Sequence, residues 1–583
     1  MRLRTWHCLC LIGLFVLLAY YPTVHAGYNS VDDLKMVTNI DRAGPLDLER
    51  LERLFVRSGS YYYRPLTILT YTLDRDLWGS IPSFMHLGNI LLHLVNALLV
   101  FAITRQLFKV LNRGSLWPAL FAGLFFALHP LATESVAWIS GRTDLLMSVF
   151  LLLAVWLTLL ALESKHPLVI MGAGVSLFVA PLAKEVAVFI LPGMLWLIAV
   201  YPGEGRLLGR LQQRWLFLAS TVGSVVAYFS LRALAIERDS GIKTALKGIA
   251  GSDGHGLFEW LDKVRVAFKV YGFYFKKLFV PWPLNFGIVE ISGWYVLVGV
   301  LLAIALLYSA WRADVLGAFG LMAFCVLSPA LLIVFGKMAW TPLSERYLYA
   351  PVALFAPLAA FFAVYVKTKV APSFGPLVNM VLIAGLAILF STTVHRAWIW
   401  QDNVRLYRDT VAKSPNFPPA KSELASALLK TGSIEEAKKI LGSMQVDDSP
   451  ASYISDDMNL AYSLAAEGEL DEARQMLLPL LEQNPKKRFD VLQSLIRVND
   501  MRLGKVDTPE GKAVIHRENL DWLLEQQRLK PQVFTLYRIG KRYLALEDEA
   551  RALDYFKKAY AQAPQDAHYR GAAASQISRL ESR

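Results

Sequence analysis

Ionisable side chains stand at the ends of apolar stretches in four places along this chain of 583 residues. An unpaired charge at the edge of a membrane costs free energy, so such residues need either partners or a function. Four groups that share one side of the membrane indicate a polar cavity rather than scattered solvated charges. The groups are Asp32 with Asp33; His129 and Glu134 with Arg142 and Asp144; Lys184 with Glu185; and Glu345 with Arg346.

The residue types in these groups match one kind of chemistry. A carboxylate can take the proton of a hydroxyl group, and arginine and lysine can hold a phosphate. A lipid-linked phosphosugar places its phosphate at the membrane surface and its sugar in water. We therefore predict an inverting glycosyl transfer, in which an acid activates the acceptor hydroxyl and cations stabilise the departing lipid phosphate.

The predicted catalytic base is Asp33 or Asp32, and Asp33 is preferred because it lies deeper in its loop. Adjacent residues of a helix diverge by ~100°, so only one of the two is expected to face the cavity. The predicted phosphate ligands are Arg346, Lys184, Arg142 and Arg64. The predicted supporting residues are His129, Glu134, Asp144, Glu185 and Glu345.

Each group also has a simpler interpretation. The two aspartates could cap an interfacial helix, and Arg64 could extend its charge to the membrane surface. Sequence neighbours could pair with each other: Arg346 with Glu345, Lys184 with Glu185, and Arg142 with Asp144 or Glu134. We predict no metal ligands at His129 and Glu134 because Pro130 interrupts the helix between them, and a divalent cation beside the aspartates remains the weaker alternative.

The chain up to residue 397 is strongly apolar. A mean hydropathy of +0.38 and 12% aromatic residues exclude a simple soluble protein and predict an all-α, polytopic membrane bundle. Crossing ~30 Å of hydrocarbon takes about 20 residues in a helix. Eleven stretches approach this length, at 6–21, 84–104, 117–132, 145–162, 168–183, 186–201, 214–235, 294–311, 315–335, 347–366 and 376–394.

Two further stretches are open to more than one interpretation. Residues 264–286 contain Lys276 and Lys277 among aromatic residues, which favours an interfacial or re-entrant helix over a span. The apolar run at 6–21 is long for a signal-peptide core, so an uncleaved membrane anchor is favoured over a removable signal. The loop at 27–83 is expected to hold amphipathic helices in the plane of the interface.

The net charge of +12 follows the membrane topology rather than one basic face. Lysine and arginine recur in alternate short loops, which is the positive-inside pattern, so nucleic-acid binding is not expected. The pattern places the 27–83 loop and the C-terminal region outside. The cysteines are Cys8, Cys10 and Cys325, all in apolar runs, so we expect no disulfide framework.

From residue 398 the spans stop and charged amphipathic helices begin. Gly432-Ser433-Ile434-Glu435-Glu436-Ala437 parallels Gly468-Glu469-Leu470-Asp471-Glu472-Ala473, and prolines recur at 415, 450, 485, 531 and 564. This spacing predicts a tetratricopeptide-like (TPR-like) α-solenoid over 398–583, with about four units and a concave surface for a protein partner. The domain prediction is thus 1–397 for the membrane part and 398–583 for the repeats.

The sequence resembles the transmembrane and TPR-repeat O-mannosyltransferases, within the GT-C class that also contains the protein O-mannosyltransferases. The resemblance runs through seven stretches in the family's order and covers nearly the whole chain. The stretches are Val31–Asp33, Tyr63–Thr67, His86–Asn96, Leu128–Ala137, Gly141–Leu146, Lys184–Glu185 and Ser344–Tyr349.

The resemblance implies a GT-C membrane transferase that uses a polyprenyl-phosphate sugar and an acid in the first outer loop as its base. The short tail departs from the family and leaves the acceptor open. We expect a bacterial homologue in the inner membrane, with periplasmic repeats and undecaprenyl phosphate as the lipid. In a eukaryote the donor would be dolichyl phosphate mannose and the repeats would be lumenal.

Three other classes of protein stay open. A non-catalytic membrane scaffold would use only the repeats to recruit partners. A lipid-linked oligosaccharide ligase would share the acid and the cations but transfer a longer glycan. A secondary transporter is less favoured, because the charges gather at one face rather than at mid-membrane.

Overall fold

The computed structural model describes residues 4–56, 63–110, 114–203, 207–235, 257–336, 341–442, 468–483, 487–563 and 569–582, together with Met458, Ala461, Leu464 and Ala465. Within these ranges every regular element is a helix, which confirms the predicted all-α class. The chain forms two compact units, Met1–Pro415 and Asn416–Arg583. The division falls later than the predicted boundary at 397/398, because the helix after the last apolar segment packs with the first unit.

The first unit is a bundle of long apolar helices. Seven segments in the described part of the chain are long and apolar enough to cross a membrane: Thr5–His25, Pro82–Val110, Ile139–Ser164, Trp215–Ala235, Val315–Phe335, Glu345–Lys369 and Pro372–Ile399. They contain helices α1 (Thr5–Tyr20), α5 (Pro82–Val110), α8 (Arg142–Ser164), α12 (Trp215–Ala235), α16 (Val315–Leu327) with α17 (Pro329–Gly336), α18 (Tyr349–Lys369) and α19 (Gly375–Ile399).

The remaining apolar helices are shorter or bent. Helix α6 (Trp117–Ala127) continues after a 46° bend into the segment Pro130–Ala137, which ends with α7 (Thr133–Ala137). Helices α9 (Pro167–Ala183), α10 (Leu191–Val200) and α15 (Tyr295–Arg312) are apolar but short. Each of the eleven predicted stretches thus contains a helix, while the number that spans stays a prediction.

Proline marks the start of many of these helices. Pro65, Pro167 and Pro376 occupy the first or second position of α4 (Pro65–Trp78), α9 and α19. A first-turn proline costs nothing there, since its missing N–H would have no partner within the helix. Helix α4 ends at Gly79, whose φ of +72° is the left-handed conformation that favours glycine.

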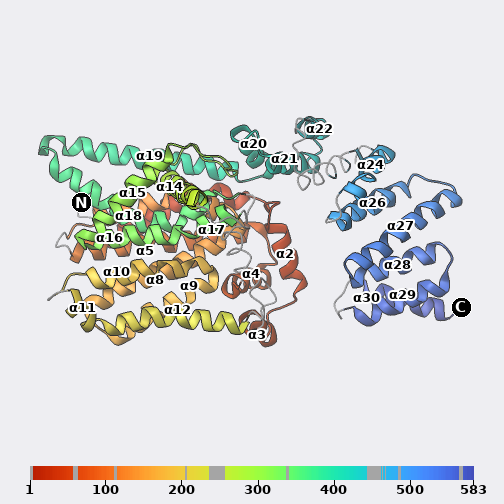
Figure 1. The fold of residues 1–583 in the computed structure, drawn as a ribbon, viewed down its shortest axis with the longest axis horizontal. Coiled ribbons are helices and arrows are strands. Elements are labelled where there is room, and N and C mark those ends of the chain that lie inside the picture. The colour runs from red at the N-terminus through yellow and green to blue at the C-terminus, as the bar shows by residue number, and fades with distance from the viewer. Residues whose placement is uncertain are drawn as a thin grey trace. The chain divides into compact units, whose positions relative to one another are not determined.

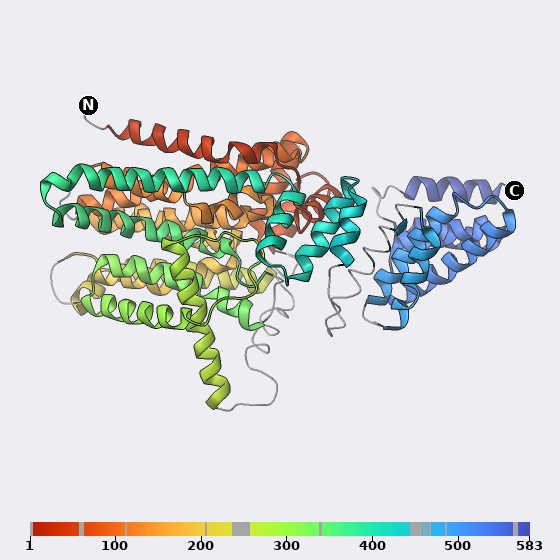
Figure 2. The same ribbon diagram turned by 90° about the horizontal axis from the view of Figure 1, so that it is seen from above.

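The predicted helices of the 27–83 loop are present, and their position at the membrane interface stays a prediction. The loop before α5 holds α2 (Asp33–Arg42), α3 (Leu48–Val56) and α4. Helix α14 (Leu257–Phe279), from the stretch predicted not to span, is absent from the described segments that could cross a membrane. Figure 2 shows α14 crossing the direction of the long helices at a steep angle.

Different helices lie at the two ends of the bundle. Figure 1 shows the N-terminus and α11 (Leu207–Gln213) at one end, with α2, α3 and α4 at the other. Basic residues of the predicted positive-inside pattern cluster where neighbouring helices end together. Lys109 of α5 lies 3.2 Å from Glu163 of α8, and Lys367 of α18 lies 5.2 Å from the ring centre of Trp117 on α6.

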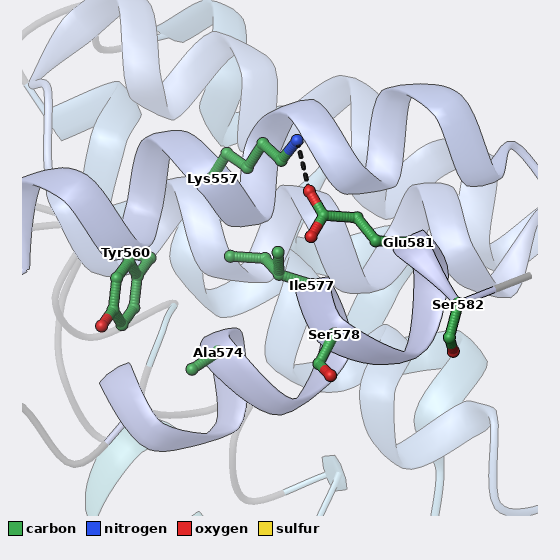
Figure 3. Close-up of a pocket in the computed structure, with 7 residues that line it drawn as sticks. All are labelled: Lys557, Tyr560, Ala574, Ile577, Ser578, Glu581 and Ser582. Atoms are coloured by element: carbon green, nitrogen blue, oxygen red, sulfur yellow. Dashed lines mark ion pairs between the residues drawn. The ribbon is translucent and has the colours of Figure 1, made fainter.

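The second unit consists of short helices in sequence-adjacent packed pairs. They are α21 (Pro418–Lys430), α22 (Ile434–Gly442), α24 (Leu470–Leu477), α25 (Leu480–Gln483), α26 (Arg488–Arg502), α27 (Pro509–Leu529), α28 (Val533–Ala545), α29 (Glu549–Gln562) and α30 (Arg570–Glu581). A pocket of about 580 Å³ lies between α29 and α30, with an ion pair of 2.6 Å between Lys557 and Glu581 at its edge (Figure 3). No predicted site residue lines this pocket.

One helix cap recurs three times in this unit. The backbone N–H of Ser433 donates to the carbonyl of Leu428, and Gly432 has φ +80°. Gly468 (φ +94°) with Glu469 has the same cap, and so has Glu547 (φ +63°) with Asp548. This repeated cap supports the predicted internal repeat, whose tetratricopeptide assignment remains a prediction. The repeat prolines at 450, 485 and 564 lie outside the described residues.

Replacing Glu547 by glycine should stabilise the second unit. A side chain in the left-handed conformation costs ~1–2 kcal/mol, and part of this is regained by Glu547→Gly, with an expected gain of ~0.5–1 kcal/mol. The free energy of unfolding, measured by denaturant titration, tests this. The reverse change at the equivalent position, Gly432→Ala, should lower the free energy of unfolding by a similar amount. If both substitutions changed this free energy in the same direction, the shared cap would be contradicted.

Candidate active site

Asp33 is a buried carboxylate whose hydrogen-bond donors, among the described residues, are all neutral. It begins α2, is 0% exposed, and its Oδ1 accepts the Ser140 backbone N–H at 2.9 Å and the Ser140 hydroxyl at 2.6 Å. Its Oδ2 accepts the Asn29 backbone N–H at 2.9 Å. Burial raises the pKa of the Asp33 carboxyl to about 6, against the lowering effect of these three hydrogen bonds. Asp32 precedes the helix and is exposed.

The turn that carries Ser140 is tightly built. Gly141 follows Ser140, and a Cβ at Gly141 would collide with the backbone carbonyl of Ser135. Only glycine therefore lets the chain fold back on itself here. The Asn89 side chain donates to the carbonyls of Trp138 and Ile139, which fixes the same turn from α5. Ser140 is thus presented to Asp33 by a rigid backbone.

Around Asp33 the predicted charges form ion pairs between different segments. The shortest distances between the charged atoms are 2.5–2.8 Å, and most of the side chains are buried. The pairs are Arg64 with Glu185, Arg142 with Asp74, Lys184 with Asp144, Lys277 with Glu345, and Arg346 with Glu134. Burial of one member without its partner would be costly, so the five pairs stabilise each other's positions.

The pairing between sequence neighbours that we considered does not occur. Glu345 pairs with Lys277 of α14 rather than with Arg346. Glu185 takes two hydrogen bonds from Arg64, at 2.7 and 2.9 Å, rather than pairing with Lys184. Adjacent side chains at the start of a helix diverge, so their partners come from other segments.

The predicted phosphate ligands differ in how many of their N–H donors are not accepted by described residues. Arg142 is 2% exposed, and its guanidinium contacts Asp74, the Asn89 side chain and the Met85 carbonyl at 2.5–2.9 Å. Arg346 uses only Nη1, toward Glu134 and Ser344; its Nε and Nη2 donate to no described residue. Lys184 donates one hydrogen bond, to Asp144, although an ammonium group has three N–H donors. Arg346 and Lys184 therefore keep donors for an anion.

The helix break near residue 129 is supported by other elements. Freed carbonyl groups at membrane depth need partners, and Thr393 of α19 donates to the Leu128 carbonyl at 2.8 Å. The His129 ring donates through Nε2 to the Leu278 carbonyl at 3.3 Å. His129 therefore braces α14 against the broken helix. Among the residues described, no three His, Cys, Asp or Glu side chains converge as metal ligands.

Unpaired buried polar atoms are concentrated in one short stretch. In native structures most buried polar atoms have a partner, so a local excess indicates room for water or a polar ligand. Five such atoms fall within residues 134–148, with no hydrogen-bond partner among the residues that the structure describes. They are Glu134 Oε2, Ser135 Oγ, Trp138 Nε1, Asp144 Oδ2 and Ser148 Oγ.

Two partners in the ion pairs had no predicted role, namely Asp74 and Lys277. Asp74 lies on the α4 face that also carries Thr67 and Tyr71, spaced four and three residues apart, so its helical register was an available signal. Lys277 was assigned with Lys276 to the interface, yet it is only 2% exposed. No pattern in the sequence distinguishes a buried lysine from an interfacial one.

A large apolar groove includes Leu278, the residue that follows Lys277. It has a volume of about 790 Å³ and is lined by side chains of α6, α14, α18 and α19, among them Phe125, Leu278, Phe355, Ala359 and Val381. Since the Leu278 carbonyl also accepts the bond from His129, the groove adjoins the broken helix.

Comparison with known proteins finds mannosyltransferases among the proteins that are similar to this chain. Residues 75–231 match the family described as dolichyl-phosphate-mannose-protein mannosyltransferase. The predicted resemblance is confirmed. The chain is 24% identical to the human protein O-mannosyl-transferase TMTC3 over 514 residues, which is 78% of this chain and 54% of that protein. It is 38% identical to Drosophila melanogaster protein O-mannosyl-transferase Tmtc1 over 142 residues, which is 23% of this chain and 16% of that protein.

The chain thus spans about half of the length of TMTC3, and its match to Tmtc1 is more local. Together with the seven apolar segments, these similarities identify an integral, multi-pass membrane protein.

The pair of Arg142 and Asp74 offers a test of the buried charges. Asp74→Asn should lower the thermal stability of the detergent-solubilised protein, because it leaves Arg142 buried without a counter-ion, at a cost of ~3–5 kcal/mol. The double variant Asp74→Asn/Arg142→Met should recover part of the loss. If the stability losses of Asp74→Asn and Arg142→Met simply add in the double variant, the two residues act independently, and the proposed pairing is contradicted.

Proposed function

We propose that this protein is a membrane glycosyltransferase that moves a sugar from a polyprenyl-phosphate donor to a hydroxyl group of a protein acceptor, with inversion at the anomeric carbon. Asp33 is the base, and Arg346, Lys184 and Arg64 hold the phosphate. The mannosyltransferase similarity over residues 75–231 supports the reaction class. The geometry supports the assignment of roles.

The observation that carries the proposal is the difference between Asp33 and its acidic neighbours. Each of the five acids in the ion pairs has a cationic partner, whereas Asp33 has only the three neutral donors of Ser140 and Asn29 among the described side chains and backbone groups. A general base works best when its pKa is near the working pH. A buried carboxylate with a pKa of about 6 meets this requirement better than a solvated aspartate.

The transfer step follows from these positions. The acceptor oxygen attacks the anomeric carbon from the face opposite the phosphate, and its proton passes to an Asp33 oxygen. The bond from the anomeric carbon to the phosphate oxygen breaks, and its electron pair stays on the lipid phosphate. Donors already fixed in place stabilise the charge that develops there, without reorganisation during the reaction.

Arg346 and Lys184 are the better supported phosphate ligands. Both keep N–H donors that no described residue accepts, and both are held in place by a carboxylate on another segment. The guanidinium of Arg346 also lies 5.0 Å from the ring centre of Trp138, a cation–π contact that helps to hold it in place. In this proposal Arg142, whose guanidinium is occupied by Asp74, Asn89 and Met85, braces the turn of Ser140 instead of contacting the phosphate.

The apolar groove is the proposed place for the polyprenyl chain. Its lining is almost wholly apolar, and it includes Leu278, whose carbonyl accepts the hydrogen bond from His129 at the helix break before Glu134. A branched isoprenoid chain fits such a surface better than water or a sugar does. The same groove would hold undecaprenyl or dolichyl phosphate, since their chains share this chemistry.

We further propose that the acids face the periplasm of a bacterium, or the lumen of the endoplasmic reticulum in a eukaryote. The second unit is then the acceptor-binding part, as its predicted repeats suggest. A scaffold without catalysis and an oligosaccharide ligase remain the alternatives. The scaffold would not need Asp33, and the ligase would require a longer lipid-linked glycan.

Asp33→Asn should abolish transfer. Loss of a general base costs ~10²–10⁴-fold in rate, so transfer of mannose from a polyprenyl phosphate to an acceptor protein should fall at least ~100-fold. In the unchanged protein the rate should rise with pH through about 6 and then level, because a protonated Asp33 cannot accept the hydroxyl proton. The readout is kcat between pH 4.5 and 8.

Asp32→Asn is the matched control, because Asp32 is adjacent, exposed and equally charged. It should keep the rate within a few-fold and leave the acidic limb of the pH profile in place. Full activity of Asp33→Asn would exclude Asp33 as the base. An equal loss of activity in both variants would contradict the assignment of Asp33, rather than Asp32, as the base.

Filling the groove should weaken donor binding. Ala359→Trp places an indole among the groove residues, so KM for the polyprenyl donor should rise ~10-fold while Tm changes little; displacing one isoprene-sized contact is worth ~1.4 kcal/mol. Ala387→Trp on α19 is the matched control, since Ala387 is exposed and does not line the groove. Equal KM values for the two variants would place the lipid elsewhere.

A further inference from the structure

The helix that follows the last apolar segment returns to the loop that carries Asp33. In α20 (Asn403–Lys413), the Asn403 side chain donates through Nδ2 to the Tyr28 carbonyl at 3.1 Å and accepts the Ser30 backbone N–H through Oδ1 at 3.3 Å. One turn later, the Tyr407 hydroxyl lies 2.9 Å from Ser30 Oγ and donates to Asn29 Oδ1 at 3.4 Å. Two residues of one helix face thus hold the three residues Tyr28–Ser30.

The first of these contacts reaches Asp33 through a single peptide group. The Tyr28 carbonyl and the Asn29 N–H belong to the same planar unit. The carbonyl accepts from Asn403, and the N–H donates to Asp33 Oδ2 at 2.9 Å. Because the unit is planar, fixing the carbonyl also fixes the direction of the N–H. Hydrogen bonding at one end of a peptide also strengthens the donor at the other end.

Burial makes this chain of contacts hard to replace. Asn29 is 7% exposed, Asp33 is 0% exposed and Tyr407 is 0% exposed. Water has little access to the loop, so a lost protein contact is not simply exchanged for a solvent contact. The remaining donors to Asp33 come from Ser140, which holds only Oδ1. Oδ2 therefore depends on the Tyr28–Asn29 peptide for its orientation.

We propose that Asn403 is a positioning residue for Asp33, acting through the Tyr28–Asn29 peptide, with Tyr407 holding the same loop. This inference rests on the proposed function, since it gives Asp33 the role of base. It assigns part of the reaction machinery to the segment between the last apolar helix and the second unit, which begins at Asn416.

The test compares Asn403→Leu with Gln401→Leu. Each change removes a side-chain amide that donates to a backbone carbonyl of the N-terminal region. Gln401 donates to the Pro22 carbonyl at 2.8 Å, whereas Asn403 donates to the Tyr28 carbonyl, which belongs to the peptide that is hydrogen-bonded to Asp33. Asn403→Leu should lower kcat ~10-fold, leave KM for the polyprenyl donor unchanged, and move the acidic limb of the pH profile upward. Gln401→Leu should change neither.

A second readout does not need transfer. Dicyclohexylcarbodiimide modifies protonated carboxyl groups, so its reaction with Asp33, followed by peptide mass spectrometry against pH, reports where Asp33 titrates. The midpoint should shift upward in Asn403→Leu and stay in place in Gln401→Leu. Such a shift in a protein that transfers no sugar would uphold the positioning role and overturn the proposed function.

Two outcomes would overturn the positioning role. One is an unchanged kcat and an unchanged labelling midpoint in Asn403→Leu, and the other is the same changes in Gln401→Leu. If Asn403→Leu does not fold, Asn403→Ala removes the same donor without adding bulk or charge, and Gln401→Ala is then its control. In the Asp33→Asn background, Asn403→Leu should cause no further loss of rate.

Discussion

The turn between the bend after α6 and the start of α8 is the constraint on which the site depends. This turn and the helix ends that flank it form the segment 134–144. In this segment Glu134 binds Arg346, Ser140 binds Asp33, and Asp144 binds Lys184. The proposed base and two of the proposed phosphate ligands, Arg346 and Lys184, come from distant parts of the chain, and this segment binds all three. Its own shape needs Gly141, where any side chain would collide with the preceding backbone. The position of the acid relative to the cations is therefore set by backbone geometry rather than by the loops that carry them.

Charge balance explains why such a site can exist at the edge of an apolar bundle. Five cations are each matched by one acid, so the cluster adds no net charge to the low-dielectric interior, and each pair removes most of the penalty of its partner. Asp33 stands outside this balance. In the part of the chain that the structure describes, its ionised form is supported by neutral donors alone, and burial raises its pKa. The surrounding pairs fix the structure, while the unpaired acid retains the capacity to exchange a proton.

Much of this was accessible from the sequence, and the failures have a common physical origin. Hydrophobic length predicted the helical segments of the first unit, and charges at the ends of apolar runs indicated the candidate site. The pairings were not predictable, because Glu345 and Arg346 are neighbours in sequence yet point to Lys277 and Glu134. A pattern in one segment does not contain the register of another segment packed against it. Asn403 lay in a stretch assigned to the repeats, where one asparagine has no distinctive spacing.

The position of α20 gives the unit boundary at Pro415 a physical meaning. At its start this helix holds the Asp33 loop, and at its end Lys413 donates to the Leu284 carbonyl while Ser414 donates to Gly287. The loop at 284–287 in turn donates the Asn285 backbone N–H to Glu345, the partner of Lys277. Helix α20 therefore contacts the loop that carries Asp33 at its start, and at its end it contacts the loop that binds the Lys277–Glu345 pair. A change in the angle of α20 would alter both loops together, so the geometry of the acid and that of the ion pairs are coupled through this helix.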